Sequence, residues 1–180
     1  MKDDAKLLTQ LQSNNSKELA FKILVKRYKE RLYWHIRKIV ISHDDTDDVL
    51  QNTLIKIIIN IDKFKGDSKL YTWMYRIATN ESITFLNSKA KRNQVSNKTL
   101  KENALQNLLA DVYFDGDEIQ LKLQKAIAQL PRIQQLVFNM RYFDDIKYKD
   151  MSEILETSEG ALKASYHIAV KKIKNYLIAN

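Results

Sequence analysis

The stretch FKGDSKLYTWMYRIATN, residues 64–80, contains a turn followed by the start of a helix. Its Gly-Asp-Ser segment at 66–68 is made of residue types that dominate turns. Beyond this segment, apolar residues recur at three- and four-residue steps, which is the spacing of one helix face. We therefore expect a helix from Lys69 to about Asn87. Ser68 or Asp67 is expected to cap it, because a side-chain oxygen there can accept from the first free N–H groups.

Helical spacing also dominates the remainder of the chain. Apolar residues recur at three- and four-residue steps from Ser16 to about Val40, and again in a segment that begins near Asp45. Asp45 can cap this second helix, with Asp48 three residues later completing a capping-box-like exchange. Further helices are expected at 119–130, 131–143, 148–155 and 161–178. The buried face of the second of these four is expected to hold Ile133, Leu136, Val137, Met140 and Phe143.

Turn-forming residues are scarce, with three glycines and one proline among 180 residues. This composition disfavours a many-stranded sandwich or barrel and favours long helices. Residues 88–101 differ in character, because they carry five cationic residues and no acidic one. We expect an all-α protein of two small helical domains, residues 1–92 and 118–180. A flexible linker at 93–117, with one short helical segment at Leu105–Leu109, is expected to join them.

The chain is basic, with a formal net charge of +8 and a pI of about 9.4. A surplus of cations favours a polyanionic partner, nucleic acid first and an acidic membrane surface second, although a basic protein without such a partner stays open. The absence of cysteine excludes disulfides and thiolate chemistry and fits a reducing cytoplasm. No signal-peptide-like stretch follows Met1, and the most apolar segment, Leu54–Ile61, is far shorter than the ~20 residues that span a bilayer. We therefore expect a cytoplasmic protein without membrane insertion.

Catalytic motifs are absent from the sequence. Glycines stand only at 66, 116 and 160, so neither a P-loop nor a dinucleotide-binding fingerprint can form. The three histidines lack metal-ligand spacing, and the acidic cluster at 44–48 is explained as a helix start. We expect no enzymatic activity, no cofactor and no metal site.

The C-terminal part has the pattern of a helix-turn-helix. A short helix at 148–155 precedes a tight turn at 157–160, with Ser158 as the expected N-cap of a longer basic helix. The second helix of such a motif enters the major groove, and its cations contact phosphates. An ordinary helical turn, with lysines that complement a helix C-terminus, is the alternative.

Three segments together resemble the extracytoplasmic-function (ECF) group of the sigma-70 family. They are DTDDVLQNTL at 45–54, the stretch at 64–80, and Leu130 to Leu177. The resemblance extends from about Phe21 to Leu177. It implies a subunit that binds core RNA polymerase, reads the minus-ten and minus-thirty-five elements of promoter DNA and helps to open it, with an anti-sigma factor as a further partner.

The resemblance also implies roles for particular residues. Polymerase binding would use the helix with Asp45, Asp48, Gln51, Asn52 and Lys56. Recognition of the minus-ten element would use Phe64, Lys65, Gly66, Asp67, Ser68, Lys69, Asn80, Lys89, Lys91 and Arg92. Recognition of the minus-thirty-five element would use Ser158, Lys163, Ser165, His167, Lys171 and Lys172. Trp73, at helical spacing with Ile77, is expected in the core.

The final helix departs from the family pattern, because three arginines usual in this group are absent. Arginine is the residue best suited to bidentate contact with guanine, so groove docking is expected without an inferred base preference. The main alternative is an autonomous helix-turn-helix regulator, which would not need the 64–80 segment beside a polymerase-docking helix. A scaffold or anti-sigma interaction protein is a third alternative, and it would not need the basic final helix.

Overall fold

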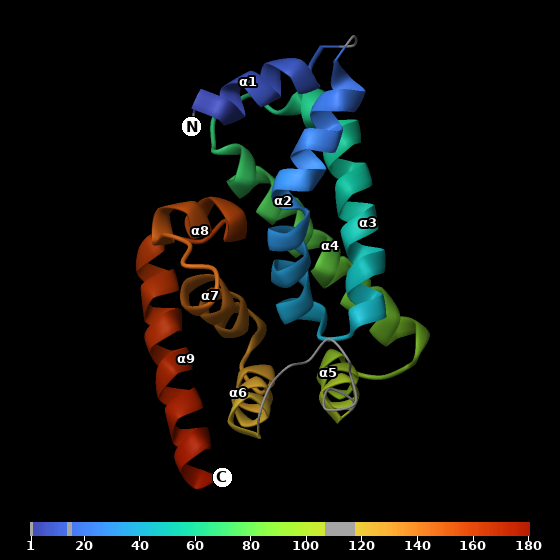
Figure 1. Ribbon diagram of the computed structural model, residues 1–180. Coiled ribbons are helices and arrows are strands. Elements are labelled where there is room, and N and C mark those ends of the chain that lie inside the picture. Colours follow the sequence, from blue (N-terminus) through green and yellow to red (C-terminus); the bar gives the residue numbers. More distant parts are fainter. Residues whose placement is uncertain (1, 14–15, 107–117) are drawn as a thin grey trace.

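The protein is described by a computed structural model that covers residues 2–13, 16–106 and 118–180. Within these ranges it is helical and has no strand, which confirms the expected all-α class (Figure 1). The first half contains α1 (Lys2–Leu11), α2 (Lys17–Val40), α3 (His43–Asn60), a 3-10 turn at Ile61–Lys63, and α4 (Leu70–Arg92). The second half contains α5 (Asn97–Gln106), α6 (Glu118–Ala128), α7 (Arg132–Tyr142), α8 (Tyr148–Leu155) and α9 (Glu159–Ala179).

The first half is a bundle of α2, α3 and α4, with α1 packed on α2 (Figure 1). Leu24, Leu32 and Ile36 of α2 are fully buried and contribute one side of its core. Ile57 of α3 and Met74 of α4 are also fully buried there. These positions follow the three- and four-residue spacing that predicted the helices.

Two expected helix caps are wrong. The N-cap of α3 is Ser42, whose Oγ accepts from the backbone N–H of Asp45 at 3.5 Å, so Asp45 lies inside the helix. The N-cap position of α4 is Lys69, which makes no side-chain capping bond, so neither Ser68 nor Asp67 caps this helix. The capping oxygen of α3 stands three residues earlier than expected because His43 and Asp44 already adopt helical geometry.

The second half follows the predicted helix-turn-helix. The short helix α8 spans the predicted residues 148–155, and Ser158 caps α9 by accepting from the N–H of Ala161 at 3.4 Å. The expected burial of Leu136, Val137 and Met140 on α7 is confirmed. The expected burial of Ile133 and Phe143 is wrong, because Ile133 is exposed on α7 and Phe143 is exposed at its C-cap.

The expected linker contains more structure than predicted. Helix α5 occupies 97–106, and Leu105 is buried in a small apolar cluster with Ile41 and Leu121. The expected helical segment at Leu105–Leu109 therefore starts eight residues earlier, and its last three residues lie outside the described ranges, as does the remainder of the linker up to 117.

The two halves are packed against each other. Helix α8 lies on α4, and α7 contacts α2 (Figure 1). One apolar core contains buried side chains from both halves, among them Met74 of α4 and Met151 and Ile154 of α8. Roughly 25 cal/mol of stabilisation is associated with each Å² of apolar surface removed from water, so these contacts favour the closed arrangement. No helix in the described part of the chain combines the length and apolarity needed to cross a membrane.

Lys101 of α5 is half-buried beside α7, where its ammonium group contacts Gln135. Burial, and secondarily the nearby Arg132, lower the pKa of Lys101 to about 8. The pKa of Lys101 is thus lower in the folded than in the unfolded protein, so protonation of its amine destabilises the fold. This penalty decreases as pH rises from about 8 towards the unfolded value near 10.5.

We expect the free energy of unfolding of the wild-type protein to rise by about 2 kcal/mol more than that of Lys101→Met between pH 7.5 and pH 9.5. Denaturant titrations at the two pH values measure this difference. Lys98→Met, one turn away on the same helix and exposed, serves as the control and should show the wild-type pH dependence. An equal rise for wild type and Lys101→Met would contradict the assignment.

Candidate promoter and polymerase interfaces

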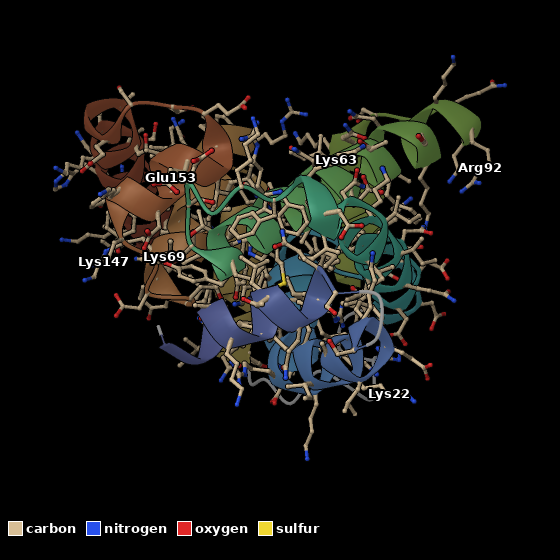
Figure 2. The ribbon with its side chains drawn as sticks, turned by 90° about the horizontal axis from the view of Figure 1, so that it is seen from above. Lys22, Lys63, Lys69, Arg92, Lys147 and Glu153 are labelled. Carbon is tan, nitrogen blue, oxygen red and sulfur yellow. The ribbon has the colours of Figure 1, made fainter. Side chains whose placement is uncertain are left out.

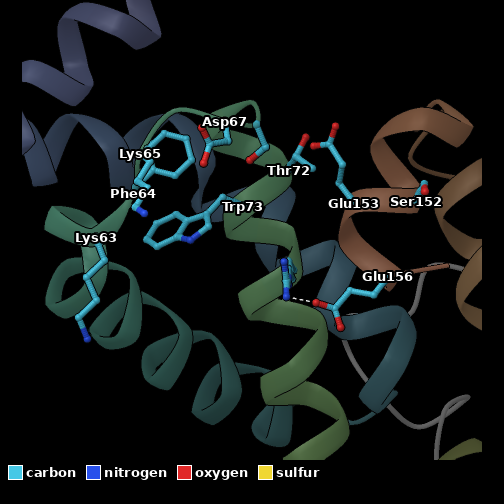
Figure 3. Close-up of a pocket in the computed structure, with 11 residues that line it drawn as sticks. Lys63, Phe64, Lys65, Asp67, Thr72, Trp73, Ser152, Glu153 and Glu156 are labelled. Carbon is cyan, nitrogen blue, oxygen red and sulfur yellow. Dashed lines mark hydrogen bonds and ion pairs between the residues drawn. The ribbon is translucent and has the colours of Figure 1, made fainter. Parts of the chain in front are cut away.

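The loop before α4 forms one wall of a cleft of about 520 Å³ (Figure 3). Phe64 is buried and packs on Trp73, with ring centroids 5.2 Å apart, so these two rings support the wall. Gly66 has a φ of +81°, a conformation that favours glycine and lets the loop turn outward. The cleft is lined by Lys63, Phe64, Lys65, Asp67, Ser68, Thr72, Trp73 and Arg76, with Ser152, Glu153 and Glu156 on the other side.

Cationic side chains surround this cleft. Lys65 is exposed, and the Nζ of Lys69 lies 3.0 Å from both carboxylate oxygens of Asp150. The hydrogen bond from Lys69 to Asp150 raises the pKa of this amine, which therefore stays protonated. Arg76 pairs with Glu156, and Figure 3 draws this contact. The cleft therefore offers an aromatic surface and cations, which are features that bind single-stranded nucleic acid. It also contains three carboxylates, those of Asp67, Glu153 and Glu156.

Asn80 lies on the exposed side of α4, one turn beyond Arg76. It does not line the cleft itself. Because residues three and four apart in a helix share a face, Trp73, Arg76 and Asn80 form a continuous strip that starts at the cleft. A single strand of nucleic acid could lie along this strip of α4, where the amide of Asn80 is available to base edges.

The other predicted minus-ten contacts lie at the far end of α4. Lys91 and Arg92 are exposed in the last turn of the helix. Lys89 instead binds Asp45 of α3, with its Nζ 2.6 and 2.7 Å from the two carboxylate oxygens. This ion pair joins two residues that the resemblance assigned to different interfaces, and it fixes α3 to α4.

Helix α3 presents a mixed polar and apolar outer face. Asp48, Gln51 and Asn52 are exposed there, and Lys56 pairs with Glu81 at 2.5 Å. The same helix exposes Ile55 and Ile59, which are 47% and 65% exposed. Exposed apolar side chains beside polar ones are a feature of protein-binding surfaces.

The outer face of α9 carries the cations of the helix-turn-helix. Lys163, His167 and Lys171 are exposed, and Lys172 is exposed as well and contacts Gln134 at 3.0 Å. Ser165 is partly buried, and the hydroxyl of Ser158 is engaged in the cap. Leu162, Ala169 and Ile173 anchor the inner face of the helix, so the cationic face is turned to solvent.

Comparison with known proteins agrees with this arrangement. Residues 24–92 match sigma-70 region 2, and residues 120–173 match sigma-70 region 4, together about two thirds of the chain. The chain belongs to the sigma-70 family: it is a sigma factor, a subunit that binds core RNA polymerase and directs promoter-specific initiation of transcription.

Its relatives place it in the ECF group. It is 29% identical to the ECF RNA polymerase sigma-E factor of Haemophilus influenzae, over 96% of this chain and 94% of the relative. It is 27% identical to the RNA polymerase sigma-H factor of Pseudomonas aeruginosa, over 89% of this chain and 86% of the relative.

Two solved structures share the fold. CnrH in complex with the cytosolic domain of CnrY superposes with a TM-score of 0.73 at 21% identity, over 98% of both chains. The sigma factor RpoE of Bartonella quintana, in complex with the anti-sigma factor NepR, superposes with a TM-score of 0.68 at 18% identity, over 89% of this chain and 98% of the other.

Sequence reasoning missed the residues that the closed fold adds to the cleft. Arg76 was detectable, because it stands between Trp73 and Asn80 at helical spacing. Glu153 and Glu156 were not, because they come from the second half and reach the cleft only through packing of α8 on α4. The exposed Ile55 and Ile59 were also missed, because an apolar side chain in a helix gives no sign by itself of whether it faces the core or a partner.

Proposed function

We propose that two separate units of this sigma factor divide promoter recognition between them. Residues 1–92 dock on polymerase and hold the opened minus-ten element, and residues 118–180 read the minus-thirty-five element. Two features together support this assignment: the first unit carries an aromatic surface with cations beside it, and the second contains a helix-turn-helix. The polymerase performs the chemistry, so the chain has no catalytic role of its own and acts in the cytoplasm.

The outer face of α3 is the proposed polymerase dock. Asp48, Gln51 and Asn52 are free for polar contacts around the exposed Ile55 and Ile59. Lys56 can contribute after exchange of its exposed ion pair with Glu81, since such pairs contribute little to stability. Asp45 supports the face indirectly, because Lys89 holds its carboxylate against α4.

The cleft and the strip on α4 are the proposed minus-ten surface. Lys65 and Lys69 would contact phosphates, while the loop at 66–68 and Asn80 would contact bases. Phe64 would contribute indirectly, because its ring is buried against Trp73 and fixes the position of the loop. Lys91 and Arg92 extend the cationic surface to the end of α4.

The outer face of α9 is the proposed minus-thirty-five reader. Lys163 and His167 stand in the first half of the helix, which approaches base edges in a helix-turn-helix. Lys171 and Lys172 stand further along, where side chains reach phosphates. Ser158 contributes by capping the helix.

We expect the purified chain to bind promoter duplex weakly and to gain sequence-specific binding only with core polymerase. Each unit alone has a small DNA surface, and polymerase is needed to present both at the correct spacing. Transcription in vitro over genomic fragments identifies the promoter, and gel shifts with and without core polymerase measure the difference. Tight, specific duplex binding by the chain alone would instead support an autonomous regulator.

An anti-sigma factor that binds both halves is a further proposed partner. The two similar solved structures are complexes, one with an anti-sigma factor. Affinity purification of the tagged chain from its native cell should recover such a protein beside polymerase. Recovery of polymerase alone under non-inducing conditions would count against this partner.

A further inference from the structure

A second cavity, of about 400 Å³, lies where the linker helix α5 meets both halves of the chain. Ile39 of α2 and Ile83 and Leu86 of α4 line it from the first half. Leu130 and Leu136 line it from the second half. Small-molecule sites in proteins typically have volumes of ~300–1,000 Å³ and mainly apolar walls. The cavity therefore has the size and the lining to hold the apolar body of a small ligand.

This cavity is separate from the cleft beside the 64–68 loop. It adjoins the second half of α4, whereas the cleft adjoins the first two turns of that helix. Figure 2 shows Arg92, at the end of α4, on the other side of the molecule from Glu153, which lines the cleft. Figure 1 shows α5 and α6 at the end of the molecule opposite to α1. None of the residues proposed to meet polymerase or promoter DNA lines this cavity.

The charged side chains at the cavity are all cationic. Among the described residues that line it, the charged ones are Lys98, Lys101 and Arg132. Lys98 is exposed and lies 3.8 Å from a carboxylate oxygen of Glu102. Within the described part of the chain, neither Lys101 nor Arg132 has a carboxylate partner. The cavity thus holds two cations whose charge no acidic side chain balances.

The two unbalanced cations disfavour each other. Burial is the larger cause that lowers the pKa of Lys101 to about 8, and the charge of Arg132 is the second. The side chains that α2 and α4 contribute to the cavity are uncharged, so they offer no compensation. An anion placed between the ammonium and guanidinium groups would relieve this repulsion and would accept charge-assisted hydrogen bonds, which are the strong ones.

We propose that this cavity binds a small carboxylic acid with an apolar body, whose carboxylate contacts Lys101 and Arg132. The apolar body would lie against Leu86 and Leu136. Gln135 is buried, and its side-chain oxygen accepts from Lys101, so it holds the amine at the cavity. Because the walls come from α4, α5 and α7, the bound acid would join the linker helix to both halves of the chain.

Titration calorimetry of the full chain with octanoate tests the site. Octanol has the same apolar chain without the charge, and it should bind at least tenfold more weakly because it cannot accept charge-assisted hydrogen bonds from two cations. Hexanoate keeps the charge but is two methylene groups shorter, and it should also bind about tenfold more weakly. The absence of octanoate binding, or equal binding of octanoate and octanol, would overturn the proposal.

A pair of variants separates this site from general attraction to a basic protein. Arg132→Met removes an exposed cation that lines the cavity, and it should weaken octanoate binding about tenfold. Lys122→Met removes the same charge from an exposed position of α6 outside the cavity, and it should bind octanoate as wild type does. Circular dichroism checks that both variants keep their helices. Equal weakening in both would show that octanoate responds only to net charge.

Proton uptake on binding identifies the contact with Lys101. The carboxylate of octanoate stays ionised between pH 7 and pH 10, and it would stabilise the protonated amine of Lys101. Since the pKa of this amine is about 8 in the free protein, affinity should fall as pH rises above this value. At pH 8.5 octanoate binding should take up protons, which calorimetry detects as a heat that depends on the ionisation enthalpy of the buffer. Lys101→Met should lose this uptake and Lys122→Met should keep it, whereas equal uptake in both variants would contradict the placement of the carboxylate.

Discussion

Replacing Asn80 with alanine is expected to reduce promoter opening about tenfold or more, while binding to core polymerase stays close to wild type. The amide can donate to and accept from one base edge, and a well-placed pair of such bonds is worth about 1–3 kcal/mol. Asn80 is exposed on α4 at the end of the strip that starts at the cleft, and α3 carries the proposed polymerase dock. Permanganate reactivity of the opened strand and a pull-down with core polymerase measure the two effects separately.

Asn87→Ala provides the matched control for this prediction. It makes the same substitution on the same helix two turns further from the cleft, where the side chain bonds to Asn97. This variant should open the promoter as wild type does. If Asn80→Ala lost polymerase binding and promoter opening to the same extent, Asn80 would belong to the dock or to the fold and not to the DNA surface.

The helices of this protein could be predicted from the sequence because each buries one face. The three- and four-residue spacing placed α2, α8 and α9 within a few residues of their observed limits. The ends were less predictable. Ser42, Asp45 and Asp48 all carry oxygens suited to capping, and backbone geometry decides which of them is used.

The candidate site was predictable only in its first half. The turn at 66–68 and the strip on α4 are local in sequence, so spacing alone brings their side chains together. The acidic wall of the cleft is not local: Lys69 and Asp150 are 81 residues apart and meet because two apolar faces pack. A pattern of charges along the chain carries no information on such a pairing, so the sequence predicted a flexible linker but not how the two halves pack.

The strongest polar link between the halves is expected at Asp144, in the turn between α7 and α8. Its carboxylate contacts the amine of Lys38 and lies 3.3 Å from Nδ1 of His35, both on α2. Burial alone would raise the pKa of this carboxyl, but the contacts with His35 and Lys38 hold it below its usual value. Burial lowers the pKa of His35, whose Nε2 lies 2.8 Å from the hydroxyl oxygen of Thr79 on α4.

Asp144→Asn should therefore lower the free energy of unfolding by about 2 kcal/mol at pH 7.5, because it removes a buried charge that two donors on α2 require. The neighbouring Asp145→Asn is the control, since Asp145 is exposed and asparagine tolerates its positive φ of 47°. Because Asp144 has a lowered pKa when folded, its contribution is present above pH 4 and is lost as pH falls through the folded pKa. Denaturant unfolding at pH 7.5 measures the loss.

The shape of the same unfolding curves tests whether the halves behave as one unit. A shared core predicts a single cooperative transition for the wild-type protein. Asp144→Asn weakens the link between α2 and the α7–α8 turn. In this variant the second half should therefore separate at a lower denaturant concentration than the one at which the first half unfolds. Trp34 and Trp73 both lie in the first half, so their fluorescence reports that half, while circular dichroism reports all helices. If the fluorescence and circular-dichroism curves of Asp144→Asn coincided, and their midpoint equalled that of Asp145→Asn, Asp144 would not hold the halves together.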